Sequence, residues 1–335
     1  MTSLIIPVLL SFFITLFFIP KWIKKAKQIG LFWEDMNKYK SEKVAGSGGL
    51  IATLSFVIAV FFYIAFKVLY LHNSDNIIQI FALLTVVLLT LVIGIVDDLL
   101  GWHKGGLSKK TRIILVILSS IPLIAINAGK DTISLPFLGM VNLGIIYPLF
   151  LIPLAIVATT TTFNFLAGFN GLEAGQGILI LSSLSLVAFL TGNSWLSVVG
   201  LCMVASLLAF LFYNFVPAKI FPGNSLTYPV GSLIAMMAIL GNFEKIAIFF
   251  FIPYILEMVL KLRGNLVKQS FGKPNPDGSL SLRYDKIYGL EHLSIFLLQK
   301  LNIKPTEKKV VCSLWAFQIL IIILGFIIFR QGIFL

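Results

Sequence analysis

The residues best suited to chemistry lie in one polar stretch, 164–176, which reads N-F-L-A-G-F-N-G-L-E-A-G-Q between two long apolar runs. Asn164 and Asn170 carry amide groups that can ligate a hard cation or hydrogen-bond the edge of a nucleobase. The glycines of the stretch would let the backbone approach a ligand closely. A polar loop that only closes a helical hairpin is the alternative, and these residues alone do not decide between the two.

An acid pair, Asp97 and Asp98, ends another apolar run after G-I-V. Adjacent carboxylates at a membrane boundary are costly unless they are paired or bind a metal. Carboxylate oxygens suit Mg²⁺, and the bases Lys110 and Arg112 follow in the same loop. Acids beside bases favour a phosphorylated substrate with a cation. An ordinary solvated acid pair at a helix end is the alternative.

Two further segments could hold an anion. The first, 221–225, reads F-P-G-N-S, and the N–H groups exposed by a Pro-Gly turn before a helix suit a phosphate. Asn224 or Ser225 could equally cap that helix. The second is a basic segment before the loop F-G-K-P-N-P-D-G, which could clamp a phosphate or touch anionic lipid head groups. Its basic residues are Lys261, Arg263, Lys268 and Lys273.

The elements that must position these residues are membrane helices. The chain of 335 residues is 58% hydrophobic with a mean hydropathy of +0.99, and only 12% of its residues are charged. A soluble domain has about twice that charge content. Several apolar runs reach the ~20 residues needed to cross a bilayer, and the period-2 alternation of a membrane barrel is absent. The apolar spans are 3–20, 47–70, 78–97, 112–128, 144–162, 176–191, 195–215, 226–241, 244–262 and 310–330.

The sequence therefore predicts one all-α polytopic membrane domain over 1–335 with ten transmembrane helices. Basic residues orient it, because almost all of them fall in the odd-numbered loops, the longest of which is 261–309. The exceptions are Lys67, Lys130, Lys245 and Arg330. The positive-inside rule places the odd loops in the cytoplasm and both termini outside. The same rule explains the net charge of +12 without a nucleic-acid partner.

Most acids follow the bases to the same side, which predicts a cytoplasmic active site at the membrane surface. A transporter would more often place ionisable groups at mid-membrane on several helices, but Glu257 is the only acid well inside a span. Segment 132–144 on the opposite side could form a small hairpin. We expect Cys202 and Cys312, both inside apolar runs, to be buried small hydrophobes.

Taken together, these segments resemble one family over nearly the whole chain, the polyprenyl-phosphate N-acetylhexosamine-1-phosphate transferases. The matching segments are, in order, D-M-N-K, V-D-D, G-L-S-K-K, N-F-L-A-G-F-N-G-L-E-A-G-Q and F-P-G-N-S. Glu173 is similar to the archaeal and eukaryotic branch, which forms dolichyl-diphosphate-GlcNAc, whereas the bacterial peptidoglycan branch typically has aspartates in that block. The resemblance implies ten membrane helices, Mg²⁺ (or Mn²⁺) dependence, tunicamycin inhibition and a homodimer.

The resemblance also implies roles for residues at the nucleotide end of the site. Asn170 matches a residue that reads uracil, and Phe221 matches one that stacks on it. Met36 and Gly46 match positions whose backbone lines the uridine pocket, and Glu173 belongs to the same substrate-binding set.

At the phosphate end, Asp97 and Asp98 match an acid pair near the lipid phosphate and the metal. Because the second pKa of a phosphate is about 6, we expect the pair to orient the lipid phosphate rather than deprotonate it. Lys110 matches a catalytic basic residue of that loop, although loop lengths differ and Lys109 or Arg112 could be the true match.

The metal and clamp positions depart from the family pattern. Asn164 matches a metal ligand, but the second ligand position, an aspartate in the family, is Asn224, which should lower metal affinity because it removes a charge. The family's His/Arg cluster is missing from the last loop, so Arg263, Lys268 and Lys273 would supply the diphosphate clamp.

The predicted reaction is transfer of GlcNAc-1-phosphate from UDP-GlcNAc to a polyprenyl (dolichyl) phosphate with release of UMP. It would be the first step of lipid-linked oligosaccharide assembly for N-glycosylation, in an archaeal-like cell membrane or an ER membrane. One alternative is a transporter of an anionic or lipid-phosphate solute, but no internal repeat supports it. An intramembrane prenyltransferase normally needs a second Asp-rich motif, which is absent.

Overall fold

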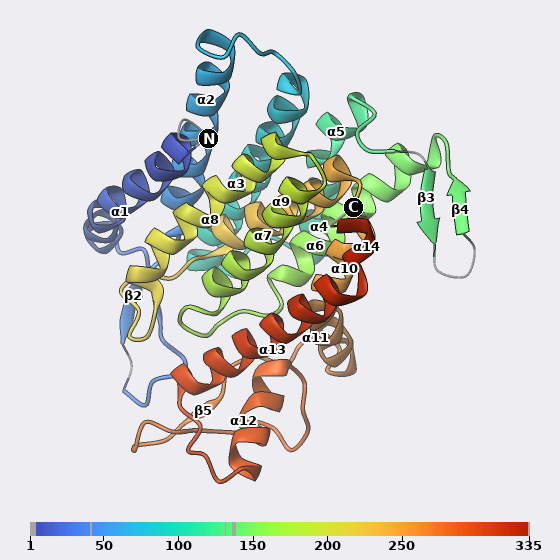
Figure 1. Ribbon diagram of the computed structural model, residues 1–335. Helices are drawn as coiled ribbons and strands as arrows, with labels where there is room; N and C mark the ends of the chain where they lie inside the picture. Colours follow the sequence, from blue (N-terminus) through green and yellow to red (C-terminus); the bar gives the residue numbers. More distant parts are fainter. Residues whose placement is uncertain (1–4, 41, 131, 136–138, 334–335) are drawn as a thin grey trace.

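The computed structural model describes residues 5–40, 42–130, 132–135 and 139–333, and nearly all of its regular structure is helical (Figure 1). Seven helices are long and apolar enough to cross a membrane. They are α1 (Ile5–Gln28), α2 (Gly49–Leu69), α3 (Ile77–Lys104), α7 (Leu172–Leu190), α8 (Ser194–Asn214), α9 (Asn224–Gly241) and α13 (Glu307–Ile328). The predicted all-α polytopic membrane architecture is therefore confirmed.

The other three predicted spans are helical but interrupted. In each span a proline occupies the first or second position of the second helix, and in one span the first helix has such a proline as well. The helix breaks there because proline lacks the N–H of a helical hydrogen bond. The pieces are α4 (Lys109–Ser119) with α5 (Ile121–Ala125), the π-helix η2 (Tyr147–Leu151) with α6 (Ile152–Phe163), and α10 (Glu244–Phe250) with α11 (Ile252–Arg263). That all ten stretches cross the membrane stays a prediction.

The remaining elements are short. Two helices, α12 and α14, and three antiparallel two-stranded hairpins complete the described chain, and the hairpin β3–β4 confirms the one predicted within 132–144. The elements are β1 (Phe32–Glu34) and β2 (Lys43–Ala45), β3 (Thr132–Leu135) and β4 (Gly139–Asn142), β5 (Lys273–Pro274) and β6 (Leu280–Ser281), α12 (Leu290–Lys300) and α14 (Arg330–Ile333).

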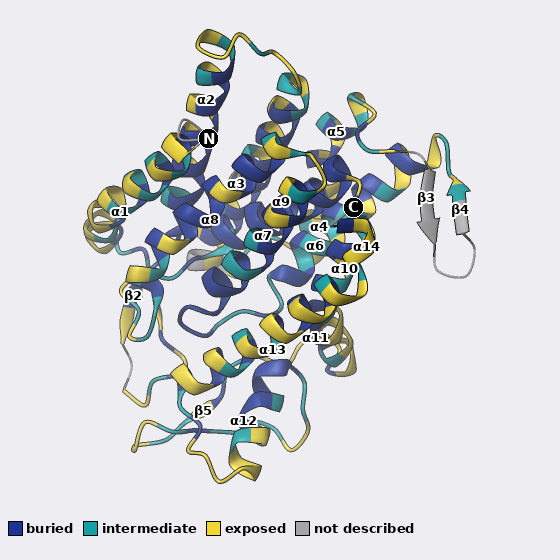
Figure 2. Ribbon diagram, in the orientation of Figure 1, coloured by how far each residue is buried: buried dark blue, intermediate teal, exposed yellow. Residues whose placement is uncertain are grey.

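Helix α9 is the centre of the bundle, and every residue in 225–241 is buried (Figure 2). It packs against α3 and α6 at very short range. A Cβ at Gly94 of α3 would lie 2.4 Å from the carbonyl oxygen of Asn224, and one at Gly231 would lie 2.7 Å from Cα of Thr160 in α6. Small residues at such contacts let membrane helices approach closely, so the beginning of α9 is held against the end of α3.

The outer helices carry many exposed residues (Figure 2). Large apolar side chains are among them, as expected of surfaces that face lipid. Phe17 of α1 is 64% exposed and Ile327 of α13 is 60% exposed. This arrangement corrects one prediction. Cys202 is buried as expected, but Cys312 lies on the exposed face of α13, because a helix at the edge of a membrane bundle buries only one of its faces.

Buried acids tie segment 261–309 to the bundle. Glu257 of α11 accepts a hydrogen bond from the backbone N–H of Leu290 at 2.6 Å, and so satisfies one of the free donors at the start of α12. It also pairs with Lys261 at 3.2 Å. The acid that the sequence places inside a span thus anchors the following loop.

Glu291 of α12 is fully buried beside Glu257. A Cβ at Gly289 would lie 2.5 Å from Oε2 of Glu291 and 3.0 Å from Oε1 of Glu257, so the two carboxyl groups surround the same point. Burial, and then the charge of Glu257, raise the pKa of Glu291 well above its usual range. The folded protein therefore favours the neutral form of Glu291.

We expect Glu291→Gln to make thermal stability less dependent on pH. The folded state keeps a proton that the unfolded chain releases above about pH 4.3, so the contribution of Glu291 to stability is full below that pH and is lost as pH rises through the raised pKa. Melting temperatures in detergent, measured from about pH 5 upward, should fall less steeply for the variant than for the wild type.

Glu257→Gln is a companion variant: it removes the charge opposite Lys261, which should lower the melting temperature at neutral pH, and it removes the charge that raises the pKa of Glu291, so its pH dependence should also be weaker than that of the wild type. Parallel pH curves for Glu291→Gln and the wild type would show that Glu291 is charged in the folded protein.

Candidate active site

One cavity of about 610 Å³ gathers the predicted functional segments at one end of the bundle. Its lining comes from each of the five odd-numbered connections between the predicted spans. Representative lining residues are Met36 of the first connection, Asp97 of the third, Asn170 of the fifth, Phe221 of the seventh and Phe271 of the ninth. All five odd-numbered connections thus reach one cavity, and their placement on the cytoplasmic side of a membrane stays a prediction.

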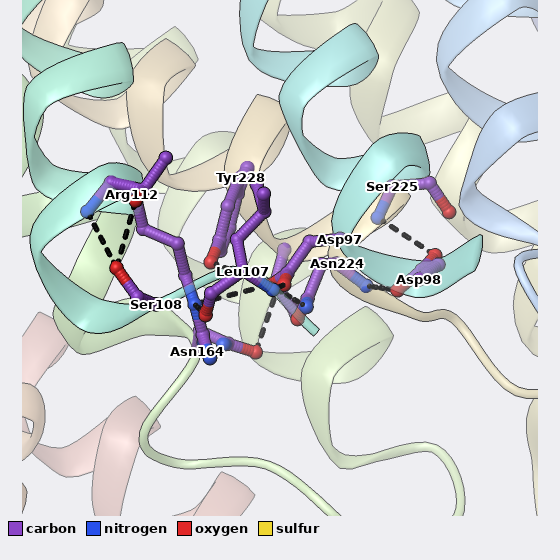
Figure 3. Close-up of polar contacts among 11 residues, drawn as sticks. Asp97, Asp98, Leu107, Ser108, Arg112, Asn164, Asn224, Ser225 and Tyr228 are labelled. Atoms are coloured by element: carbon purple, nitrogen blue, oxygen red, sulfur yellow. Dashed lines mark hydrogen bonds and ion pairs between the residues drawn. The ribbon is translucent and has the colours of Figure 1, made fainter. Parts of the chain in front are cut away.

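Asp97 is a buried carboxylate with several donors (Figure 3). Its Oδ1 accepts the backbone N–H of Leu107 at 2.6 Å. Its Oδ2 accepts Nδ2 of Asn224 at 2.6 Å and the hydroxyl of Tyr228 at 3.2 Å. Nε of Arg112 lies 3.4 Å from the same oxygen. These partners offset the cost of burying the charge.

The loop after α3 is built around Asp97. A Cβ at Gly106, whose φ is +81°, would come 2.8 Å from Oδ1 of Asp97, so a side chain there would meet the acid. Ser108 then caps α4 by accepting the N–H of Thr111 at 3.2 Å. The cap sets the first turn of α4, from which Arg112 reaches Asp97. Lys110, the predicted base, is exposed on that turn, and its catalytic role stays a prediction.

Asp98 holds the beginning of α9 (Figure 3). Its Oδ1 accepts the backbone N–H of Asn224 at 2.7 Å, and its Oδ2 accepts the N–H of Ser225 at 3.3 Å. Ser47 adds a hydroxyl donor at 3.0 Å. The cap of α9 thus comes from another helix and not, as the sequence suggested, from Asn224 or Ser225. A carboxylate at this end also complements the helix dipole.

Four oxygen-bearing side chains of the cavity suit a hard cation, those of Asn164, Asn224, Asp97 and Asp98. Asn224 points its Nδ2 at Asp97, so its Oδ1 faces the other way and accepts no hydrogen bond from the described residues. Among the described residues, Oδ1 of Asn164 accepts one hydrogen bond, from the hydroxyl of Thr227 at 3.1 Å. Within the described ranges there is no cluster of three or more His, Cys, Asp or Glu for a metal.

The residues predicted to bind the nucleotide, Met36, Asn170, Glu173 and Phe221, also line the cavity. Phe221 is held by its backbone, because its N–H donates to the carbonyl of Ala45 at 2.7 Å. Glu173 accepts the N–H of Gly168 at 2.9 Å and so supports the loop 164–171. Its predicted contact with a substrate stays a prediction.

Gly46 does not itself line the cavity, but its neighbour Trp33 does. A Cβ at position 46 would lie 1.7 Å from Cζ3 of Trp33, so only glycine leaves room for the indole ring. The carbonyl of Gly46 accepts the indole N–H of Trp22 at 3.0 Å. Gly46 therefore shapes the pocket through Trp33.

The bases predicted to clamp a diphosphate lie apart from the cavity. Arg263, Lys268 and Lys273 are not among its lining residues. Lys268 instead sits 4.9 Å above the ring of Tyr284 and lines a smaller hollow of about 260 Å³. The ninth connection reaches the main cavity through Gln269 and Phe271. The structure does not bring the three bases into the cavity lining, and the diphosphate clamp stays a prediction.

A polar network beside Asn170 was not identified from the sequence. Asp35 accepts Nδ2 of Asn170 at 2.8 Å, and Glu307 accepts its backbone N–H at 2.9 Å. Lys38 pairs with Glu307 at 2.6 Å. Burial lowers the pKa of Lys38, but interactions with Glu307, Asp35 and Glu42 outweigh it and raise the pKa. Asp35 and Lys38 belong to the motif D-M-N-K at residues 35–38, which could have indicated them. No local sequence pattern indicated Glu307.

Comparison with known proteins places these features in one family. The model of glycosyl transferase family 4 matches residues 80–242, from α3 to the end of α9. A Saccharolobus solfataricus protein, provisionally named UDP-N-acetylglucosamine–dolichyl-phosphate N-acetylglucosaminephosphotransferase, is 33% identical over 328 residues, which is 97% of each chain.

Two more distant relatives extend the likeness. The UDP-N-acetylglucosamine–dolichyl-phosphate N-acetylglucosaminephosphotransferase of Dictyostelium discoideum is 29% identical over 292 residues, covering 76% of this chain and 69% of the relative. The phospho-N-acetylmuramoyl-pentapeptide-transferase of Nautilia profundicola is 30% identical over 285 residues, covering 75% of this chain and 76% of the relative.

Asp98→Asn is expected to destabilise the fold. The amide keeps one acceptor but turns an N–H₂ group toward donors that the carboxylate now accepts, and a buried unsatisfied donor costs about 1–3 kcal/mol. The melting temperature in detergent should fall by several degrees. Asp277→Asn is the matched control, because Asp277 is exposed and its ion pair with Lys304 is screened by solvent. Equal melting temperatures for the two variants would contradict the capping role.

Proposed function

Because this chain belongs to glycosyl transferase family 4, we propose that it transfers GlcNAc-1-phosphate from UDP-GlcNAc to a polyprenyl phosphate of the dolichyl type and releases UMP. It is a membrane phosphoglycosyltransferase, and its product begins lipid-linked oligosaccharide assembly for N-glycosylation. Two relatives named for this activity match most of this chain, one of them over 97% of both sequences. The observation that carries the proposal is one cavity that is lined by four of the five motif segments of the family, all except G-L-S-K-K.

The cavity offers different groups to the two ends of a nucleotide sugar. Phe221 provides an aromatic face for the base, and Asn170 provides a polar edge beside it. Arg112, which pairs with Asp97, carries the positive charge that favours phosphate groups, whereas the N–H groups at the beginning of α9 are already bound to Asp98. In the reaction, an oxygen of the lipid phosphate forms a bond to the sugar-bearing phosphorus, and the bond from that phosphorus to the UMP oxygen breaks.

Phosphoryl transfer of this kind depends mainly on positioning and charge neutralisation. The bonds of Asp97 to Leu107, Asn224 and Tyr228 support a positioning role for this acid rather than a role as base. A lipid phosphate with a second pKa of about 6 needs little deprotonation at neutral pH. Asp97 would therefore keep Arg112 and Asn224 in place for the phosphates.

Mg²⁺, or Mn²⁺ in its place, would neutralise charge on the diphosphate when bound. Asn164 and Asn224 would hold it through their amide oxygens, with the acid pair nearby. A set with two neutral ligands binds a divalent cation more weakly than one with an added carboxylate. Asn224 donates a hydrogen bond directly to Asp97. If position 224 carried an aspartate, the two carboxylates could be joined only through a proton or a cation.

The proposed topology has ten membrane passes, both termini outside and the cavity at the cytoplasmic face. The shared lining by the five odd connections supports it, as does the concentration of basic residues in those loops. The segment 261–309 would then be a cytoplasmic loop within one domain over 1–335. An apolar groove between helices would take the lipid chain, in an archaeal-like cell membrane or an ER membrane, and the enzyme would form a homodimer.

UMP release from UDP-GlcNAc, measured with dolichyl phosphate and Mg²⁺ in detergent, tests the proposal. We expect turnover by the wild type and a loss of about 100-fold or more in Asp97→Asn, because the variant misplaces groups that stabilise charge in the transition state. Asp277→Asn should keep wild-type turnover. If the folded wild type releases no UMP with this acceptor, the proposed reaction is wrong.

Asn224→Asp tests the metal site by a physical readout. Without divalent cations the variant should melt below the wild type, because two carboxylates would meet at a contact of 2.6 Å. Mg²⁺ should raise its melting temperature more than that of the wild type, since binding to the folded state stabilises it. Choline chloride at equal ionic strength is the control, and an equal response of both proteins to Mg²⁺ would exclude position 224 from the cation site.

A further inference from the structure

Asn170 is held by two acids from distant parts of the chain. Glu307, at the start of α13, accepts its backbone N–H at 2.9 Å. Asp35, just after β1, accepts its side-chain Nδ2 at 2.8 Å. Lys38 bonds to the other oxygen of Glu307 at 2.6 Å and closes the network. The backbone and the side chain of Asn170 are therefore fixed separately.

The bond to Asp35 decides which way the amide of Asn170 points. An ionised carboxylate can only accept hydrogen bonds, so the nitrogen of the amide must face Asp35 and the oxygen must face the opposite way. Asn170 is buried and lines the cavity. Its Oδ1 accepts no hydrogen bond from any residue in the described ranges, which leaves an oriented acceptor for a ligand.

We propose that Asp35 is the positioning residue that makes the site specific for uracil over cytosine, by fixing the Asn170 amide with its oxygen toward the base. Uracil carries a donor at N3, which this oxygen accepts. Cytosine carries an acceptor at N3 and would bring two acceptors together. The inference deepens the proposed function and rests on it.

The surroundings of Asp35 make its charge essential to this orientation. Its Oδ1 accepts the backbone N–H of Asn37 at 3.1 Å, and its Oδ2 accepts Asn170. In Asp35→Asn the single remaining oxygen is drawn to the N–H of Asn37. The new N–H₂ group then faces Asn170, whose amide must turn its oxygen to that donor and its nitrogen toward the cavity.

The expected result of Asp35→Asn is thus a changed preference and not a general loss of binding. A ligand that leaves a buried polar group without a partner binds more weakly by about tenfold or more. UMP should bind about tenfold more weakly to the variant, and CMP should bind at least as tightly as to the wild type. The ratio of the two dissociation constants should shift by about tenfold or more toward CMP.

The measurement is titration calorimetry of purified full-length protein with UMP and with CMP, with melting temperatures to verify folding. Asp277→Asn is the control, because it removes an equal charge at an exposed position that does not line the cavity, and it should keep the wild-type ratio. In Asn170→Ala the amide is absent, so the preference for UMP should fall by about tenfold or more while Phe221 still stacks on either base.

Equal weakening of UMP and CMP by Asp35→Asn would reduce Asp35 to a structural residue and overturn the inference. A full UMP preference in Asn170→Ala would also overturn it, since the reader of the base would lie elsewhere. If the wild type binds UMP with strong preference but no variant changes the ratio, only this inference fails. If the wild type binds neither nucleotide, the proposed function fails with it.

Discussion

Buried carboxylates accepting backbone N–H groups are the interaction on which the rest of this structure depends. Asp98 takes the free N–H groups at the start of α9, and Asp97 takes that of Leu107 at the start of the next loop. Each carboxylate would be costly at a membrane boundary without donors, and each helix end would be costly without acceptors. One contact offsets both costs, so the end of α3 must lie against the beginning of α9. The cavity forms where the two helices meet.

The same principle recurs around the cavity. Glu257 accepts the N–H of Leu290 and ties the long loop 261–309 to α11, while Glu307 accepts the N–H of Asn170 and ties α13 to the motif loop. Acids that look like candidates for catalysis are largely used to join segments. The joined segments then present polar atoms that the acids themselves do not use.

Acids also determine the chemistry of their amide neighbours. Asp97 holds the nitrogen of Asn224, and Asp35 holds the nitrogen of Asn170, so both amides turn an oxygen away from the acid. An amide is otherwise ambiguous, since its two ends differ little in shape but oppose each other in hydrogen bonding. A carboxylate removes that ambiguity without touching the ligand. At Asn224 the oriented oxygen suits a cation, and at Asn170 it suits a donor on a base.

The sequence by itself determined the helical membrane class and the segments that line the cavity, because hydropathy and motif spacing are local properties. Four residues that it singled out, Asp97, Asn164, Asn170 and Phe221, line the same cavity. Only the tertiary structure decided that Arg112 meets Asp97, that Asp98 caps α9, and that Glu307 holds Asn170. These contacts join residues far apart in the chain or depend on the rotation of a helix, which no local pattern encodes.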